Sequence, residues 1–442
     1  MNPFASLKSR IIDATKQDTI RHLGFTYSSR LISAFLRLVA SVVIARTLGA
    51  ERLGTLTIAA VIMGLTMRVL DMGLTTTLIR KLSLHISQDD DDEGNAVFRR
   101  IFLFQVQVSA AAVIAGYFVA PLLAVRLYGS PDLVAPLRLA FFGAFIFNLE
   151  HLVDAVLRAH EKFKQIAIIN VVSHIARTAV ITLLAYVIFY LDVERTLIIN
   201  IAQIFMAFMI ASLLIPKRYF IASIRKPYPF REVFAYSGWI YVYNLLFMLF
   251  DRLDVLMLGY FRAGTEVGLY AVAFQLIKPF EMIPETLNIV FLPKVSKYTK
   301  KLQIFRYFKN TLKITCFVGF FGLIMLIAAK PLILTIYGAE YAPSVKLFQI
   351  LIGAFILLTI LNPFTLAGHT INKPQLFVMM AGVNLVLNFV GNLIFIPMYG
   401  AVGAAIVTLL SRVIGGIIGL FILKWFLSRW VDRDDVESSQ NG

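Results

Sequence analysis

Long apolar stretches, separated by short polar segments, dominate the hydrophobic pattern of the chain. Each stretch is close to the roughly 20 residues that an α-helix needs to cross the hydrocarbon core of a bilayer. Twelve spans are predicted, at about residues 27–45, 55–79, 101–124, 137–157, 166–190, 196–215, 236–259, 268–292, 310–329, 347–367, 375–396 and 403–423. Turn sequences such as Pro397-Met398-Tyr399-Gly400 lie between them. The pattern therefore predicts an all-α, polytopic membrane protein with about twelve transmembrane helices.

Composition and charge agree with a membrane protein. Apolar residues make up 59% of the 442 residues and charged residues 15%, whereas soluble globular chains average about 45–50% and about 25%. A net charge of +16 would suggest nucleic acid as a partner of a soluble protein, but in a polytopic chain it indicates positive-inside bias. With the N-terminus inside, 26 of the 42 Lys and Arg residues fall on the cytoplasmic side and seven on the opposite side. Both termini are therefore predicted to be cytoplasmic, and no nucleic-acid partner is expected.

The two halves of the chain resemble each other at a near-constant offset of about 210 residues. The clearest pair is Ala120–Gly129 and Lys330–Gly338, since both segments contain Pro-Leu and end in Tyr-Gly. Six spans in each half give both halves the same orientation, and transporters often bind substrate at such a repeat interface. The alternative is that two similar amphipathic loops simply recur. The predicted organisation is an N-terminal cytoplasmic segment, a six-helix lobe, a cytoplasmic linker, a second six-helix lobe and a cytoplasmic tail, at residues 1–24, 25–215, 216–235, 236–426 and 427–442.

Charged residues inside the spans are the candidate functional residues, because a charge at the bilayer centre costs about 2.5–3.5 kcal/mol on insertion scales. Arg30 and Arg37 lie two helical turns apart on one face of the first span, which contains no acid. Paired guanidiniums suit an anionic ligand such as a phosphate, to which each can donate two hydrogen bonds. The alternative is an internal salt bridge to Asp254 or Glu285.

Other intramembrane charges come in closely spaced groups. Arg68 and Asp71 are three residues apart in the second span, so they either neutralise each other or serve a ligand. In the seventh span, Asp251 and Asp254 share one helical face, and Arg252 is expected to point away from both. These groups are candidates for ligand binding or for coupling.

The eighth span combines a lysine with two glutamates and two prolines. Lys278 precedes Glu281 and Glu285, which are four residues apart and form a carboxylate stripe. Prolines kink a transmembrane helix, which is tolerated where the helix lines a cavity. The stripe could therefore hold a proton or a cation.

Some polar residues of the spans have an equally plain structural interpretation. Asn384, Asn388 and Asn392 recur every four residues in the eleventh span and could bind sugar hydroxyls or a neighbouring helix. Arg412 lies near a span end and is expected to extend toward the membrane surface. The position of Arg177 is ambiguous, so its side chain could extend to the surface or face the protein.

Motifs of catalysis and nucleotide binding are absent from the sequence. There is no Walker motif, no Gly-x-Ser-x-Gly elbow and no His-Glu-x-x-His helix. The longest outward loop, at about residues 330–346, is too small to form a catalytic domain. The chain is therefore predicted not to be an enzyme and to have no cofactor or metal, with H⁺ or Na⁺ as a candidate coupling ion.

The segment ARTLGAERLGTLTIAAVIMGLTMRVLDMGLTTTLIRKLS, from Ala45 to Ser83, resembles the opening of the polysaccharide transporter family. That family holds the O-antigen-type flippases of the multidrug/oligosaccharidyl-lipid/polysaccharide exporter superfamily. The two Tyr-Gly loops and the PKVS sequence at Pro293–Ser296 fit it as well. The resemblance implies a V-shaped pair of six-helix lobes around a cationic cavity, which works by alternating access. The substrate would be a sugar on undecaprenyl diphosphate, moved to the outer leaflet of the bacterial inner membrane, with a glycan polymerase as a candidate partner.

Charges and resemblance together predict a flippase for lipid-linked oligosaccharide. Flippases of the peptidoglycan precursor carry essential arginines in the first two spans and near the eighth. The candidate diphosphate-binding residues, matched by span position, are Arg30, Arg37, Arg68, Arg252 and Lys278. The candidate coupling or gating acids are Asp71, Asp254, Glu281 and Glu285, and the candidate sugar contacts are Asn384 and Asn388. Two alternatives stay open: a drug/cation antiporter of the same superfamily, and a membrane glycan polymerase or acyltransferase.

Overall fold

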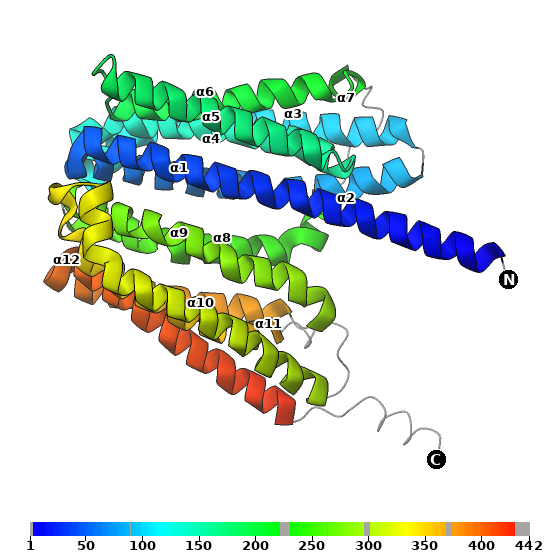
Figure 1. Cartoon of the computed structure of the whole chain (residues 1–442). Helices are drawn as coiled ribbons and strands as arrows, with labels where there is room; N and C mark the ends of the chain where they lie inside the picture. The colour runs from blue at the N-terminus through cyan, green and yellow to red at the C-terminus, as the bar shows by residue number, and fades with distance from the viewer. Residues whose placement is uncertain are drawn as a thin grey trace. The chain divides into compact units, whose positions relative to one another are not determined.

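The computed structural model is helical throughout its described residues, among which there is no strand (Figure 1). It describes the backbone of residues 3–88, 90–221, 230–262, 264–295, 301–367 and 374–428, and the side chains of 24–88, 90–221, 241–262, 264–280 and most of 303–360 and 379–421. The helices are α1 (Pro3–Asp71), α2 (Leu74–Ser87), α3 (Asp91–Pro121), α4 (Val134–Ala159), α5 (Phe163–Tyr186), α6 (Val193–Leu214), α7 (Arg218–Ile221), α8 (Phe230–Phe261), α9 (Gly264–Val295), α10 (Lys301–Ile336), α11 (Ser344–Ala367) and α12 (Pro374–Ser428), with short helices η1 (Leu122–Leu127), η2 (Pro131–Leu133) and η3 (Ala339–Tyr341). The all-α prediction is confirmed.

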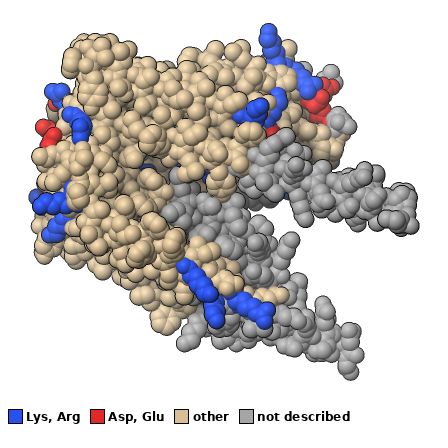
Figure 2. Space-filling model, viewed as in Figure 1, with Lys and Arg blue, Asp and Glu red and all other residues tan. Residues whose placement is uncertain are grey.

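Several of these helices have the length and apolarity of membrane spans. Within the described part of the chain there are seven such stretches: Gly24–Asp71, Asp91–Leu127, Pro131–Ala159, Phe163–Tyr186, Val193–Leu214, Lys309–Ile336 and Met379–Ile418. On the face drawn in Figure 2, charged side chains gather mostly toward the helix ends, and the surface between them is largely uncharged. The chain is therefore a multi-pass membrane protein.

Two of the long helices are each interrupted by a sharp glycine kink. Gly49 in α1 has a φ of 73° and a ψ of 171°, and Gly400 in α12 has a φ of 58° and a ψ of −137°. A positive φ is costly for residues with a Cβ, so glycine is the residue that turns the backbone here without strain. Each kink lies between two spans that the hydrophobic pattern separates.

The described chain divides into two compact units, and α1 contributes to both. The first unit consists of residues 1–47 and 62–238, and the second of residues 48–61 and 239–442. Residues 48–61 of α1 thus pack with the C-terminal helices, although the rest of α1 on either side belongs to the first unit.

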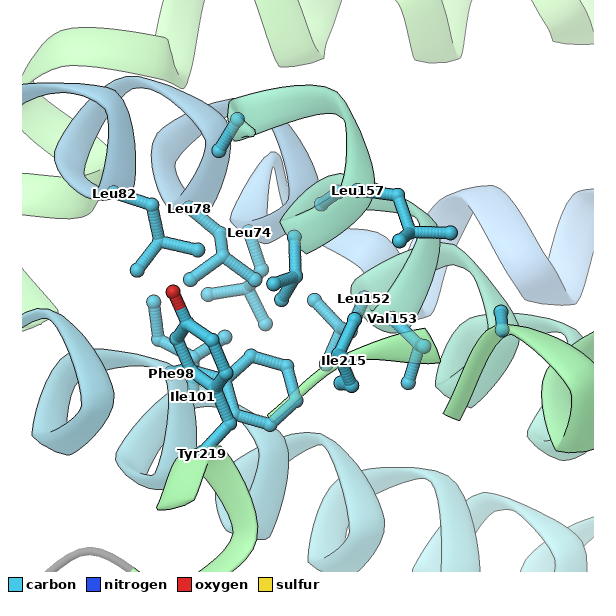
Figure 3. Close-up of a cluster of buried hydrophobic side chains, with 14 of the residues drawn as sticks. Leu74, Leu78, Leu82, Phe98, Ile101, Leu152, Val153, Leu157, Ile215 and Tyr219 are labelled. Carbon is cyan, nitrogen blue, oxygen red and sulfur yellow. The ribbon is translucent and has the colours of Figure 1, made fainter. Parts of the chain in front are cut away.

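The core of the first unit gathers where α2 meets α3 and α4. Leu74, Leu78 and Leu82 of α2 are fully buried and pack with Phe98 of α3 and Val153 of α4 (Figure 3). The spacing of four residues places the three leucines on one face of α2. This short amphipathic helix therefore closes one end of the helix bundle of its unit.

The second predicted span ends earlier than expected. α1 stops at Asp71, and Met72 and Gly73 turn the chain with φ angles of 48° and 77° before α2 begins. The prediction of a span to residue 79 was wrong because the buried face of α2 continues the apolar pattern across the turn.

In the second unit, α1 and α9 approach each other at the level of their backbones. A Cβ added to Gly54 would overlap the carbonyl oxygen of Gly264, and one added to Gly268 would overlap that of Ala50. The N–H of Ala50, just after the kink, donates to Oε1 of Glu340 at 2.8 Å. Glycine at these positions is what permits the close packing.

Candidate functional site

Among the polar side chains within the described apolar helices, two groups contain predicted site residues and lie one in each unit. The Arg37 cluster of the first unit consists of Arg37 of α1, His174 and Arg177 of α5, and Asn200 of α6. The Asp251 cluster of the second unit consists of Asp251 and Arg252 of α8, Lys278 of α9 and Arg412 of α12. Both clusters contain residues that the sequence predicts to bind a diphosphate.

In the Arg37 cluster, both guanidiniums are held by uncharged acceptors. Nη1 of Arg37 lies 3.3 Å from Nε2 of His174, and Nε of Arg177 donates to Oδ1 of Asn200 at 2.6 Å. Arginine has no acceptor atom, so the hydrogen bond requires Nε2 of His174 to accept and its proton to be on Nδ1. The charges of both guanidiniums act on this imidazole. The hydrogen-bond partners of these two guanidiniums are thus a neutral imidazole and a neutral amide.

No carboxylate of the described residues pairs with Arg30, Arg37 or Arg177. Arg30 is exposed, two turns from Arg37 on the same helix. Within its own unit, Arg37 contacts a neutral imidazole. The alternative of a salt bridge to Asp254 or Glu285 is not tested, because these acids belong to the second unit and the side chain of Glu285 lies outside the described residues. An uncompensated pair of guanidiniums in membrane helices is suited to binding an anion.

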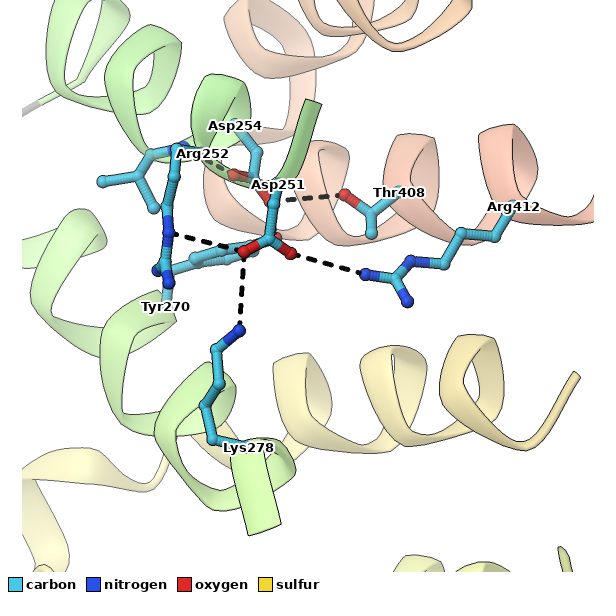
Figure 4. Close-up of polar contacts among 8 residues, drawn as sticks. Asp251, Arg252, Asp254, Tyr270, Lys278, Thr408 and Arg412 are labelled. Carbon is cyan, nitrogen blue, oxygen red and sulfur yellow. Dashed lines mark hydrogen bonds and ion pairs between the residues drawn. The ribbon is translucent and has the colours of Figure 1, made fainter. Parts of the chain in front are cut away.

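The Asp251 cluster is arranged around one carboxylate (Figure 4). Oδ2 of Asp251 lies 3.4 Å from Nε of Arg252 and 3.4 Å from Nζ of Lys278, and its Oδ1 lies 3.8 Å from Nη2 of Arg412. Two predictions were wrong here. Arg252 does not point away from Asp251, since its Nε contacts that carboxylate. Arg412 does not extend to the membrane surface, since its side chain is only 12% exposed.

Asp254, beside this cluster, is a buried carboxylate with donors from three helices. Its residue exposure is 3%, and it accepts hydrogen bonds from the hydroxyl of Tyr270, from Oγ1 of Thr408 at 3.3 Å and from the N–H of the next residue at 2.8 Å (Figure 4). Such a group can hold a proton or a cation in the membrane. The other two predicted acids of this unit, Glu281 and Glu285, lie outside the residues whose side chains are described.

The predicted pair of Arg68 and Asp71 does not form. Asp71 instead accepts hydrogen bonds from the N–H groups of Gly73 at 3.2 Å and Thr75 at 3.3 Å, and from the Thr75 hydroxyl. These donors belong to the turn and first residues of α2, so the carboxylate acts as a helix cap. Arg68 is exposed. The structure thus gives Asp71 a structural role at the end of the second span.

Replacing Asp71 with alanine is expected to destabilise the protein by about 1 kcal/mol, as for other lost caps. Asp71→Asn should retain more of the stability, because its amide oxygen can still accept from the N–H and the hydroxyl of Thr75, and only the N–H of Gly73 loses its acceptor. Thermal unfolding of the detergent-solubilised variants measures the difference. A gating role would predict the reverse pattern, with Asp71→Asn normally stable but inactive in transport.

The asparagine stripe of α12 is directed into the second unit. Asn388 is 1% exposed and Asn392 is fully buried, and Nδ2 of Asn392 donates to Oδ1 of Asn388 at 2.9 Å. The amide of Asn384 packs so closely on Gly415 that a Cβ there would overlap it. This burial favours the helix-packing interpretation over contact with sugar hydroxyls.

Sequence reasoning missed two members of the Arg37 cluster and one partner of Asp254. His174, Asn200 and Tyr270 are neutral, so a search for intramembrane charges does not select them. The three-residue spacing of His174 and Arg177, which places both on one face of α5, is the signal that could have found the first cluster.

Comparison with known proteins places this geometry in context. Residues 43–346 match the model of a family described as polysaccharide biosynthesis protein. A Shigella flexneri protein named as an O-antigen transporter is 24% identical over 401 residues, which cover 87% of this chain and 92% of that protein. A Haloferax volcanii protein named as the flippase AglR is 28% identical over 196 residues, which cover only 42% of this chain and 40% of that protein.

Solved structures share the fold over most of their length. The inward-facing conformation of a multidrug resistance MATE family transporter of the MOP superfamily aligns with a TM-score of 0.74 at 12% identity, covering 90% of this chain and 95% of that one. The lipid II flippase MurJ in an inward closed conformation aligns with a TM-score of 0.66 at 16% identity, covering 92% and 87%. At such identities the likeness shows the fold alone.

Proposed function

Because this chain belongs to the polysaccharide biosynthesis protein family, we propose that it is a flippase for lipid-linked oligosaccharide. The relatives named as an O-antigen transporter and as a flippase support this proposal. The shared fold with a MATE transporter and MurJ supports alternating access in a chain of about twelve spans, with six-helix lobes at about residues 25–215 and 236–426. The proposed location is the cytoplasmic membrane, with both termini in the cytoplasm.

The observation that carries the proposal is the uncompensated charge of the Arg37 cluster. A lipid-linked oligosaccharide on undecaprenyl diphosphate brings its negative charge into the membrane, and guanidiniums bind phosphate oxygens with paired hydrogen bonds. Arg30 and Arg37 are the proposed primary ligands of the diphosphate, with Arg68 as a further one. Arg252 and Lys278, which contact Asp251, are the second proposed pair.

Transport also needs a coupling group, and Asp254 has the chemistry for one. Its carboxylate is buried among hydroxyl and N–H donors, so loading and release of H⁺ or Na⁺ would change the charge of its surroundings. Asp71 is a weaker candidate because it caps α2. A role for Glu281 and Glu285 remains a prediction.

The test is transport of a fluorescent oligosaccharide on undecaprenyl diphosphate in vesicles that contain the purified protein. Arg37→Gln should reduce the rate at least about tenfold, which corresponds to about 1.4 kcal/mol of lost interaction, while insertion and stability stay normal. Arg126→Gln, an exposed arginine of the same unit, is the matched control. Equal transport by Arg37→Gln and the control would contradict the proposal.

The drug/cation antiporter is the second candidate, favoured by Asp254 and by the likeness to a MATE transporter. A cationic substrate is disfavoured by the unpaired guanidiniums of the Arg37 cluster. Efflux of a cationic dye that depends on a Na⁺ or H⁺ gradient, without transport of the lipid-linked sugar, would favour the antiporter.

A further inference from the structure

The helix α5 adds two residues to the site that α1 begins. His174 and Arg177 lie three residues apart on one face of α5, and both are half-buried. Oγ1 of Thr178 reaches the carbonyl of Leu36 at 3.4 Å, so α5 packs against α1 where Arg37 contacts His174. The two helices therefore hold their basic side chains in one place.

The acceptors of this cluster differ from those of three other arginines of the described helices. Arg158 donates to the carboxylate of Asp154 at 2.6 Å, and Arg252 and Arg412 both contact Asp251. Each of these arginines contacts a carboxylate, although the single carboxylate of Asp251 is shared by Arg252, Lys278 and Arg412. In the Arg37 cluster an imidazole and an amide take the place of the acid, so the hydrogen bonds orient the guanidiniums without cancelling their charge.

Two like charges within membrane helices are costly, and an anion between them removes the cost. The charge of Arg37 acts on Arg177 as well as on His174. Arg177 is half-buried and Arg37 is exposed, so this repulsion is screened less than between two charges in water. A phosphate group, with up to two negative charges and several acceptor oxygens, matches two guanidinium forks.

The two ring nitrogens of His174 differ in their contacts. Its Nδ1 is buried and has no hydrogen-bond partner among the described residues, which costs about 1–3 kcal/mol for an unsatisfied buried donor. Within this part of the chain, the contact of the other nitrogen with Arg37 is therefore the one hydrogen bond that this orientation of the ring provides. Nε2 is the atom that makes the contact with Arg37. The imidazole is thus placed to orient Arg37, in the way that Asn200 orients Arg177.

We propose that Arg37 and Arg177 together bind one phosphate group, and that His174 and Asn200 are the positioning residues of this phosphate site. The assignment of that phosphate to a lipid carrier rests on the proposed function, whereas the site itself would equally take a free phosphate. Arg177 thereby becomes a ligand of the substrate head group, contributed by the fifth span.

The decisive variant is Asn200→Asp, which keeps the shape of the side chain and its contact with Arg177 but adds the missing negative charge. The purified protein in nanodiscs is titrated with geranylgeranyl diphosphate, with inorganic pyrophosphate and with geranylgeraniol, which has no phosphate. Wild type should bind the diphosphate lipid, and Asn200→Asp should weaken this binding at least about tenfold without loss of thermal stability. Asn148→Asp adds a carboxylate at a buried position of α4 in the same unit and is the matched control.

Unchanged binding by Asn200→Asp would overturn the site, as would wild-type protein that binds neither phosphate probe. If pyrophosphate binds as tightly as the lipid and Asn200→Asp weakens both, the phosphate site stands and the lipid-linked substrate loses its support. The transport assay with Arg37→Gln decides the proposed function separately.

His174 has its own test because its role is positional. His174→Gln keeps an acceptor for Arg37 and should retain binding of geranylgeranyl diphosphate, whereas His174→Leu should lose about as much affinity as Asn200→Asp. If both variants bind alike while remaining folded, the positioning role is wrong.

Discussion

Gly54→Val is expected to prevent the chain from reaching its native packing. In the second unit, a Cβ at Gly54 would overlap the backbone carbonyl of Gly264, and a backbone atom cannot move aside as a flexible side chain can. To relieve the overlap, α1 would have to separate from α9, and the hydrogen bond from Ala50 to Glu340 would be strained as well. Overpacking costs about 1–3 kcal/mol of stability and sometimes more. The cost of Gly54→Val should lie at the upper end of this range, because α1 must separate from α9.

Fluorescence-detected size exclusion of the solubilised protein measures this effect. Gly54→Val should give an aggregated profile or a thermal midpoint lower by about 5 °C or more. Gly353→Ala is the matched control, because no atom lies within 4 Å of a Cβ added there. In α11 it should be neutral or stabilising, since alanine favours a helix over glycine by about 1 kcal/mol. A wild-type profile for Gly54→Val would show that α1 does not pack on α9 in this way.

This close packing also shows what the sequence could not reveal. The hydrophobic pattern predicts each apolar stretch, because membrane helices need a length of apolar residues that can be read locally. It does not reveal that residues 48–61 pack with the C-terminal helices, since that depends on glycines about 210 residues apart along the chain. The pattern also predicts that the second span continues past Asp71, because the buried face of the amphipathic helix α2 is apolar like a membrane span.

The candidate site was predictable only in its charged part. Arg37 and Asp254 stand out because charges are rare in apolar spans. Their partners do not, because imidazole, amide and hydroxyl groups are common in helices for many reasons. The prediction for Arg412 was wrong for another reason. Its place near a span end suggests that the side chain reaches the membrane surface, but the side chain instead contacts Asp251 on a different helix.

Asp254→Asn is expected to abolish gradient-driven transport while leaving the fold largely intact. The amide oxygen can still accept hydrogen bonds from Tyr270 and Thr408, so the loss of stability should stay within about 1–2 kcal/mol. The amide of asparagine does not take up and release a proton as a carboxylate does, and it binds Na⁺ less strongly because it carries no charge. If Asp254 is the coupling group, its neutral replacement separates transport from the ion gradient.

The measurement is transfer of the fluorescent lipid-linked oligosaccharide from one leaflet of the vesicle membrane to the other under an imposed H⁺ or Na⁺ gradient. Tyr270→Phe is the matched variant, since it removes one donor but keeps the carboxylate, and it should transport with an altered dependence on pH or Na⁺. A structural role for Asp254 predicts the opposite order, with Asp254→Asn active and gradient-dependent to the extent that it is folded. Loss of the dependence in a stable Asp254→Asn protein, together with its retention in Tyr270→Phe, would assign coupling to the carboxylate rather than to the hydrogen-bonded network around it.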